Sequence, residues 1–155
     1  MTERYISIAS GAATLSAILH TPASDNAANM ADTGVLIIVG GPQYRVGSHR
    51  QFVKLSRALA AQGIASMRLD SAGMGDSSGA KMAFYQQDND INQAIAAFLQ
   101  HCPQLKKVVL WGLCDAASAI LIKLNQPDPR ISGIILLNPW VRQQHSHAGV
   151  MLKHY

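Results

Sequence analysis

Apolar and polar positions follow two different periods along the chain, which divide it into short strands and amphipathic helices. Residues 4–9 and 14–20 each show the two-residue period of a strand, and the turn signal Ser10-Gly11 between them predicts an N-terminal hairpin. Residues 35–39 (VLIIV) form an uninterrupted apolar run, which is typical of a strand covered on both faces. Further strands are predicted at residues 64–69 and 107–111, and a last buried strand at 131–137.

Amphipathic helices are predicted between these strands. Ser48 is the expected N-cap of a helix over residues 49–62. Two more helices are predicted over residues 88–100 and 116–125, and the first of these presents an inward face of Ile91, Ala94, Ile95 and Phe98. Strands that alternate with helices through short loops predict a parallel sheet with right-handed crossovers. The expected fold is α/β: a three-layer α/β/α sandwich whose mostly parallel sheet carries an N-terminal antiparallel hairpin.

One domain over residues 1–155 is expected. Residues 21–34 (TPASDNAANMADTG) are small, polar and aperiodic, which predicts a flexible loop. Residues 141–155 are polar and rich in histidine, and are interpreted as the start of a cap or as a C-terminal tail. The length of 155 residues, with 48% hydrophobic and 14% charged residues, is typical of one globular domain with a substantial core.

The net charge and the cysteine content indicate which kinds of partner and which cellular compartment to expect. The net charge is +4, but the basic residues are dispersed, so no nucleic-acid partner is expected. Two cysteines, Cys102 and Cys114, do not form a disulfide framework and favour a reducing cytoplasm. The N-terminus lacks the basic and apolar regions of a signal peptide, and no apolar run approaches the roughly 20 residues of a membrane span.

The stretch from Lys106 to Ser118 (KKVVLWGLCDAAS) carries the candidate chemistry. An apolar strand runs into Gly112-Leu113-Cys114-Asp115-Ala116, and a helix pattern of small residues follows. A strand, a sharp turn with one nucleophile and a helix form a nucleophile elbow, whose motif G-x-S-x-G here reads G-x-C-x-A. The N-terminal dipole of the helix and backbone N–H groups aimed at the sulfur favour a thiolate, which is a strong nucleophile.

A free cysteine is more often a small buried apolar residue than a nucleophile, and only the elbow context favours the catalytic reading of Cys114. The backbone N–H of Asp115 is the first expected donor to an oxyanion. The second is expected in the loop after residues 35–39, where Pro42 has no N–H, which leaves Gln43 as the preferred donor and Gly41 as the alternative.

Tyr44, Arg45 and Trp140 are the expected substrate-binding residues. For Arg45 two readings stay open: it binds an anionic group of a substrate, or it forms a salt bridge or lies in solvent. The segment 73–79 (GMGDSSG) departs from the dinucleotide fingerprint G-x-G-x-x-G because Ser78 stands where the last glycine is required, so a structural loop is favoured. No cofactor and no metal is expected, since His145 and His147 lack nearby cysteine or carboxylate ligands.

Four motifs carry a resemblance to a known family: residues 40–52 (GGPQYRVGSHRQF), 73–77 (GMGDS), 111–118 (WGLCDAAS) and 137–142 (LNPWVR). Together they resemble the α/β-hydrolase-fold proteins associated with exosortase A systems (the hydrolase 1 type), which are encoded beside bacterial exopolysaccharide and protein-sorting genes. The resemblance covers nearly the whole chain from Val35 onward. More distantly, the cysteine elbow is similar to that of dienelactone hydrolases.

The chain departs from that family pattern in two places. Ser71-Ala72 stands where such proteins tend to carry an aromatic residue and an arginine. The family order is nucleophile, acid, histidine, yet this chain ends one strand after the nucleophile strand, so the C-terminal strands bearing the acid and the histidine are expected to be missing. Asn138 lies at the right edge to orient a histidine such as His145 or His147, although no spacing demands it.

The resemblance and the elbow together imply a hydrolase that acts on an ester or thioester through Cys114. Its partner is expected to be a small acyl or ester substrate, and this chain, an apparent N-terminal portion, is expected to be weakly active or inactive. The alternative is a non-catalytic hydrolase-like protein that binds a ligand or partner. An exposed sheet edge also predicts a homodimer. A nucleotide-binding doubly wound domain is the third, weaker reading.

Overall fold

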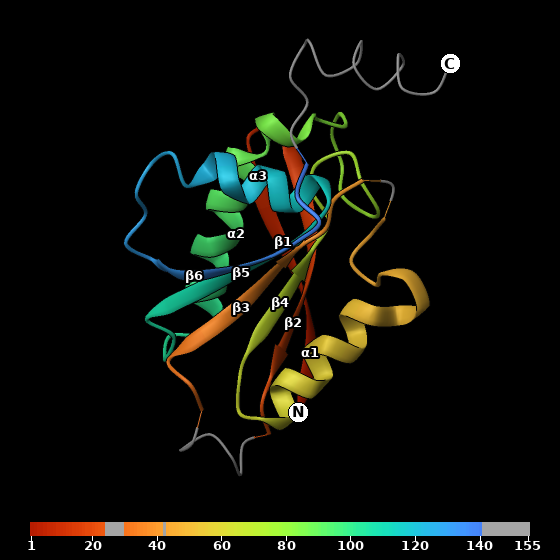
Figure 1. The fold of residues 1–155 in the computed structure, drawn as a ribbon. Coiled ribbons are helices and arrows are strands. Elements are labelled where there is room, and N and C mark those ends of the chain that lie inside the picture. The colour runs from red at the N-terminus through yellow and green to blue at the C-terminus, as the bar shows by residue number, and fades with distance from the viewer. Residues whose placement is uncertain (24–29, 42, 141–155) are drawn as a thin grey trace, which may run out of the picture.

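The computed structural model describes residues 1–23, 30–41 and 43–140 (Figure 1). A sheet of six strands runs through the centre in the order β1-β2-β4-β3-β5-β6. The strands are β1 (Thr2–Ser10), β2 (Ala13–Thr21), β3 (Thr33–Ile38), β4 (Ser66–Leu69), β5 (Lys107–Leu113) and β6 (Ile131–Leu137). β1, β2 and β4 pair antiparallel, whereas β4, β3, β5 and β6 are mutually parallel. The predicted hairpin and parallel sheet are both confirmed.

Helices cover the two faces of the sheet. Figure 1 shows α1 (Gln51–Ala61) on one face and α2 (Asp88–His101) and α3 (Asp115–Lys123) on the other. β3 explains this division, because Val35 and Ile37 pack toward Phe52 of α1 while the alternate residues Leu36 and Ile38 join the core beneath α2 and α3. The three-layer α/β/α sandwich is therefore confirmed, and so is the prediction that the strand near residues 35–39 is covered on both faces.

The predicted inward face of α2 is confirmed, since Ile91, Ala94, Ile95 and Phe98 are all at most 1% exposed. The predicted start of α1 is wrong. Residues Ser48–Arg50 form a short 3-10 turn instead, in which His49 and Arg50 have left-handed φ angles of 49° and 58°, and Ser48 makes no capping hydrogen bond. The α-helix accordingly begins only at Gln51.

The prediction that the last strand is buried is also wrong. β6 pairs with β5 on one side only, and Ile134, Ile135 and Leu137 are 37%, 46% and 40% exposed. An apolar run shows that a strand forms, but it does not show how many neighbouring elements cover that strand. Among the described residues β6 is an edge of the sheet (Figure 1).

The loop predicted over residues 21–34 is shorter than expected, because Thr21 still belongs to β2 and Thr33–Ile38 form β3. Its residues 24–29 lie outside the described part of the chain, as do Pro42 and the predicted cap or tail at 141–155. Within the described parts, none of the helices combines the length and the apolarity needed to traverse a bilayer.

Candidate active site

Cys114 is the single residue between β5 and α3, and its backbone geometry is unusual. Its φ and ψ angles are 53° and −117°, a combination that a residue with a side chain adopts only when its surroundings enforce it. The Cys114 N–H donates to the carbonyl of Leu137 at 2.9 Å, which anchors the turn to the end of β6. The chain therefore turns from strand to helix in one residue and leaves the thiol partly exposed.

Two glycines allow this sharp turn to form. A Cβ on Gly112 would lie 2.7 Å from Cδ1 of Ile120 and 2.8 Å from the backbone of Ala116. A Cβ on Gly40, at the end of the β3 segment, would overlap the amide nitrogen of Ala116 and approach Asp115. The backbone after β3 is thus in close contact with the first turn of α3, beside Cys114.

The N–H groups of the two expected oxyanion donors have no acceptor within the described part of the chain. Asp115 is the first residue of α3, and neither its N–H nor that of Gln43 donates to any acceptor among the described residues. The Gln43 side chain is held by Gln51, whose Nε2 donates to Oε1 at 3.3 Å. The oxyanion roles themselves stay predictions.

Arg45 forms ion pairs, which is one of the two readings left open by the sequence. Its guanidinium contacts the carboxylates of Asp70 and Asp76, and its backbone N–H donates to Oδ1 of Asp70 at 2.5 Å. Asp70 is fully buried at the end of β4. The two carboxylates stabilise the charged guanidinium and raise the pKa of Arg45 above its usual value despite partial burial. A role in substrate binding is left untested.

Trp140 lies against the first turn of α3. Its indole N–H donates to Oδ1 of Asp115 at 2.6 Å, and its backbone N–H donates to Oγ of Ser118 at 3.0 Å. Its ring also contacts the ring of Phe84 with a centroid distance of 5.3 Å. These contacts join the end of β6 to the elbow and to the loop before α2.

Asn138 is the described side chain that reaches the sulfur. Its Nδ2 lies 3.8 Å from Cys114 Sγ, and its own φ is 49°, a left-handed value. Within residues 1–23, 30–41 and 43–140, no histidine is hydrogen-bonded to the Cys114 thiol, and no group of three potential metal ligands occurs. His145 and His147 lie outside the described residues.

Two cavities flank this region. One, of about 290 Å³, is lined by Gly41, Gln43, Tyr44, Gly73, Met74, Gly75 and Lys81. The other, of about 410 Å³, is lined by Lys81, Met82, Ala83, Phe84, Tyr85, Asp115 and Trp140. Lys81 and Phe84 were missed by sequence reasoning, because the segment that holds them has neither a clear period nor a motif. The predicted residues Tyr44, Gln43, Asp115 and Trp140 all line one cavity or the other.

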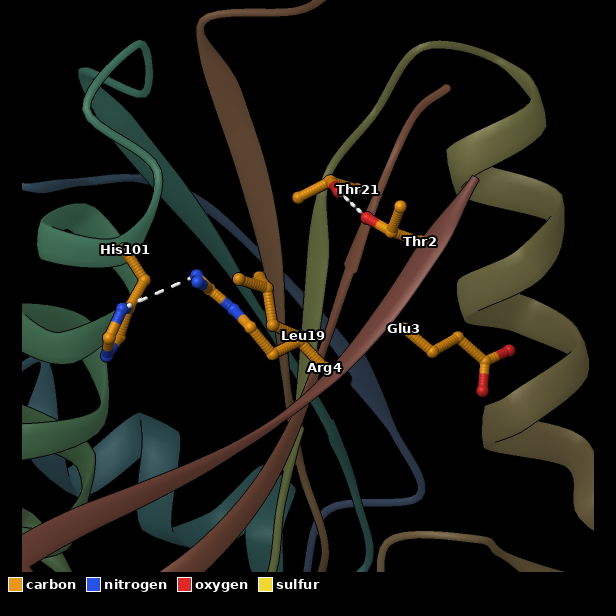
Figure 2. Close-up of a pocket in the computed structure, with 6 residues that line it drawn as sticks. All are labelled: Thr2, Glu3, Arg4, Leu19, Thr21 and His101. Atoms are coloured by element: carbon orange, nitrogen blue, oxygen red, sulfur yellow. Dashed lines mark hydrogen bonds between the residues drawn. The ribbon is translucent and has the colours of Figure 1, made fainter. Parts of the chain in front are cut away.

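A further cavity of about 490 Å³ lies at the opposite end of the sheet (Figure 2). Thr21, which lines this cavity, comes directly after His20, and His20 pairs with Ser66, the first residue of β4. The cavity therefore lies near the start of the parallel strands, whereas Cys114 follows the end of one of them, β5. Figure 2 shows Arg4 pointing toward His101, with Nη2 3.5 Å from Nδ1, and Glu3 pointing to the other side. No cysteine or serine lines this cavity.

The comparisons with known proteins agree with this architecture. The model of the family described as serine aminopeptidase S33 matches residues 32–154. No curated protein sequence gives a significant match.

Solved structures match over almost all of the chain at low identity. An esterase of Pyrococcus furiosus, PF2001, has a TM-score of 0.78 and 16% identity, and the match covers 99% of this chain and 56% of the esterase. The α/β hydrolase GrgF of Penicillium sp. sh18 has a TM-score of 0.74 and 20% identity, with coverages of 99% and 53%. The lidless serine hydrolase XC6422 of Xanthomonas campestris has a TM-score of 0.65 and 18% identity, with coverages of 88% and 61%. The chain spans about half the length of these structures.

Proposed function

Since the chain belongs to the serine aminopeptidase S33 family of α/β hydrolases, we propose that it attacks a carboxylic ester or thioester through Cys114. The observation that carries this proposal is the backbone of Cys114, with φ 53° and ψ −117° between β5 and α3. Such a turn exposes the side chain at the carboxyl end of a parallel strand, where sites of doubly wound sheets form. A serine hydrolase is among the structures that this chain resembles, and in the proposed reaction Cys114 takes the place of the serine.

The proposed reaction has two steps. The thiolate of Cys114 attacks the carbonyl carbon, the bond to the leaving alcohol or thiol breaks, and the leaving group takes up a proton. Water then hydrolyses the acyl-thioester, which releases the acid and regenerates the thiol. The N–H groups of Asp115 and Gln43 stabilise the negative charge on the carbonyl oxygen, and each such donor is typically worth about 10²–10³ in rate.

Acyl transfer to Cys114 is the step that the described residues support best. They supply the proposed nucleophile, the two N–H donors and the Asn138 amide beside Sγ, but none of the described histidines is hydrogen-bonded to the sulfur. We therefore expect acylation to be observed more readily than turnover. Proton transfer by an acid and a histidine is part of the proposal for the whole protein.

Mass spectrometry of the protein after incubation with p-nitrophenyl acetate tests this proposal. We expect an acetyl adduct on Cys114, its absence in Cys114→Ala, and its persistence in Cys102→Ala. Cys102 is the matched control because it is 1% exposed and burial raises the pKa of its thiol. Equal acylation of Cys102 and Cys114, or none of Cys114, would contradict the proposal.

The proposal extends to the genetic context, the location and the oligomeric state of the protein. The four motifs support a link to exosortase A systems and exopolysaccharide export, and the two unpaired cysteines support a cytoplasmic location. A survey of the genes beside the coding sequence tests the first, and fractionation of the source cells tests the second. The exposed β6 edge supports a homodimer, which is tested below.

One alternative, a non-catalytic hydrolase-like protein that binds a ligand, is favoured because no described histidine is hydrogen-bonded to Cys114. Ester turnover that is lost in Cys114→Ala excludes this alternative. Binding of an acyl ligand with equal affinity to the wild type and to Cys114→Ala, without any adduct, supports it.

A further inference from the structure

We propose that Lys81 recognises an anionic group, a carboxylate or a phosphate, on the substrate that Cys114 attacks. This inference rests on the proposed function and adds the class of substrate. Lys81 is the residue that lines both cavities beside the elbow. One of these cavities contains Gln43 and the other contains Asp115, the two expected oxyanion donors. If the carbonyl group of a ligand lies between those donors, the rest of the ligand reaches Lys81 whichever of the two cavities it occupies.

Charge favours an anion at this position. Lys81 is the one charged residue that lines the cavity of about 290 Å³, and its side chain is exposed with no hydrogen bond or ion pair to the described residues. The nearby carboxylates of Asp70 and Asp76 are both engaged by Arg45. In the second cavity the Asp115 carboxylate accepts a hydrogen bond from the Trp140 indole.

The backbone around Lys81 is held in place. A Cβ on Gly73, whose φ is 69°, would overlap the amide nitrogen of Lys81 and the carbonyl carbon of Ala80. The segment that carries Lys81 is therefore packed directly against the loop after β4. That contact fixes where the side chain starts and so limits the space that the ammonium group can reach.

The second cavity adds an apolar surface next to this charge. Phe84 contacts Trp140 at a centroid distance of 5.3 Å with an interplanar angle of 58°, and Tyr85 at 5.5 Å and 80°. Aromatic rings of this kind offer contact area to an apolar chain. The substrate that fits both features is an ester or thioester with an apolar part and a terminal carboxylate or phosphate.

Alkylation of Cys114 by a matched pair of reagents tests the role of Lys81 without requiring turnover. Iodoacetate and iodoacetamide both form a bond from Sγ to carbon and release iodide, but only iodoacetate carries a negative charge. In Lys81→Gln we expect the ratio of the iodoacetate rate to the iodoacetamide rate at Cys114 to fall about five-fold. Lys81→Arg should retain the ratio. Lys54→Gln, which removes an exposed charge of α1, should leave it unchanged.

Using the ratio separates this inference from the proposed function. An unchanged ratio in Lys81→Gln overturns the inference even when Cys114 is acylated by the ester. If the ester does not acylate Cys114 but the rate ratio still falls in Lys81→Gln, the proposed function is overturned instead. Protection of Cys114 from iodoacetamide by succinate identifies a carboxylate ligand, and protection by inorganic phosphate identifies a phosphate. Protection by neither, or equal protection in Lys81→Gln, counts against the inference.

Discussion

Arg45 is bonded to Asp70 through both its backbone and its side chain. The Arg45 N–H donates to Oδ1 at 2.5 Å and the guanidinium contacts Oδ2, while the Asp70 side chain is fully buried and that of Arg45 is only 13% exposed. Arg68 adds a third constraint, since its Nη1 donates to the Arg45 carbonyl at 2.7 Å. Arg45, which follows the proposed oxyanion loop, is therefore held through its N–H by Asp70, directly after β4, and through its carbonyl by Arg68 within β4.

Asp70→Asn should loosen this loop and destabilise the fold. The substitution removes the buried partner of Arg45 and leaves the exposed carboxylate of Asp76 to pair with its guanidinium, so we expect the free energy of unfolding to fall by about 2 kcal/mol. The Gln43 N–H would then be held less firmly in the position of an oxyanion donor, so acylation of Cys114 should slow by up to about 10². Urea unfolding and the acetylation rate measure the two effects. The exposed pair of Arg57 with Glu3 supplies the control, because Arg57→Gln should change neither. Reduced stability with an unchanged acetylation rate would contradict the positioning role.

His20 connects the same region to β2, and it predicts a pH effect on stability. It is fully buried, and Arg68 Nε lies 3.0 Å from its Nε2. Burial, and then the charge of Arg68, lower the pKa of His20 from 6.5 to about 4, while Glu3 opposes this shift. The unfolded chain therefore protonates His20 near pH 6.5, whereas the folded protein protonates it only near pH 4. The contribution of neutral His20 to stability is fully present above pH 6.5. It decreases as the pH falls below 6.5, by at most about 1.4 kcal/mol per pH unit.

Urea unfolding of the wild type and of His20→Gln between about pH 7 and 5 measures this contribution. The wild type should lose stability more steeply than the variant over this range. Carboxylates with lowered pKa values, such as Glu3 and Asp128, titrate at lower pH and are common to both proteins. Parallel stability profiles for the two proteins would show that His20 is not held neutral in the folded state.

The sequence was sufficient for the features that local pattern determines. The α2 face from Ile91 to Phe98 follows from helical period alone, and the Cys114 turn follows from a strand, small residues and a helix in succession. The left-handed geometry at His49 and Arg50 was not predictable, because it belongs to an irregular loop that the hydrogen bond from the Phe52 N–H to the Val46 carbonyl closes, and no sequence pattern indicates that bond.

The two missed residues of the candidate site, Lys81 and Phe84, share one cause. They lie beside Trp140, which the sequence did predict, only because the loop before α2 folds over the end of β6. A local sequence pattern does not predict which distant segments come into contact. The same limit explains β6, whose apolar residues predicted a strand correctly but gave no information about the element beside Ile135.

Gly112→Ala should damage the elbow itself. The added Cβ would lie 2.7–2.8 Å from Ile120 and from the backbone of Ala116 and Ala117, so α3 has to shift relative to β5. Overpacking of this kind costs about 1–3 kcal/mol, and the displaced α3 carries the Asp115 N–H. We expect lower thermal stability together with slower acetylation of Cys114. Gly133→Ala is the matched strand control, since its Cβ would meet only Val109 Cγ2 at an ordinary 3.6 Å. Equal effects of the two substitutions would contradict the close fit at Gly112.

The β6 edge predicts self-association. Its sequence ISGIILL contains no charge and no proline, the devices with which proteins usually protect an edge strand, and Ile135 is 46% exposed. Pairing of two β6 strands across a two-fold axis would continue the sheet and cover this apolar surface. Sedimentation velocity should show a concentration-dependent dimer that Ile135→Lys abolishes. Leu121→Lys is the control, because Leu121 is similarly exposed, at 38%, but lies on α3 rather than on the strand edge. If both substitutions weaken association equally, general apolar contact rather than strand pairing joins the two copies. A wild type that stays monomeric at every concentration contradicts the homodimer.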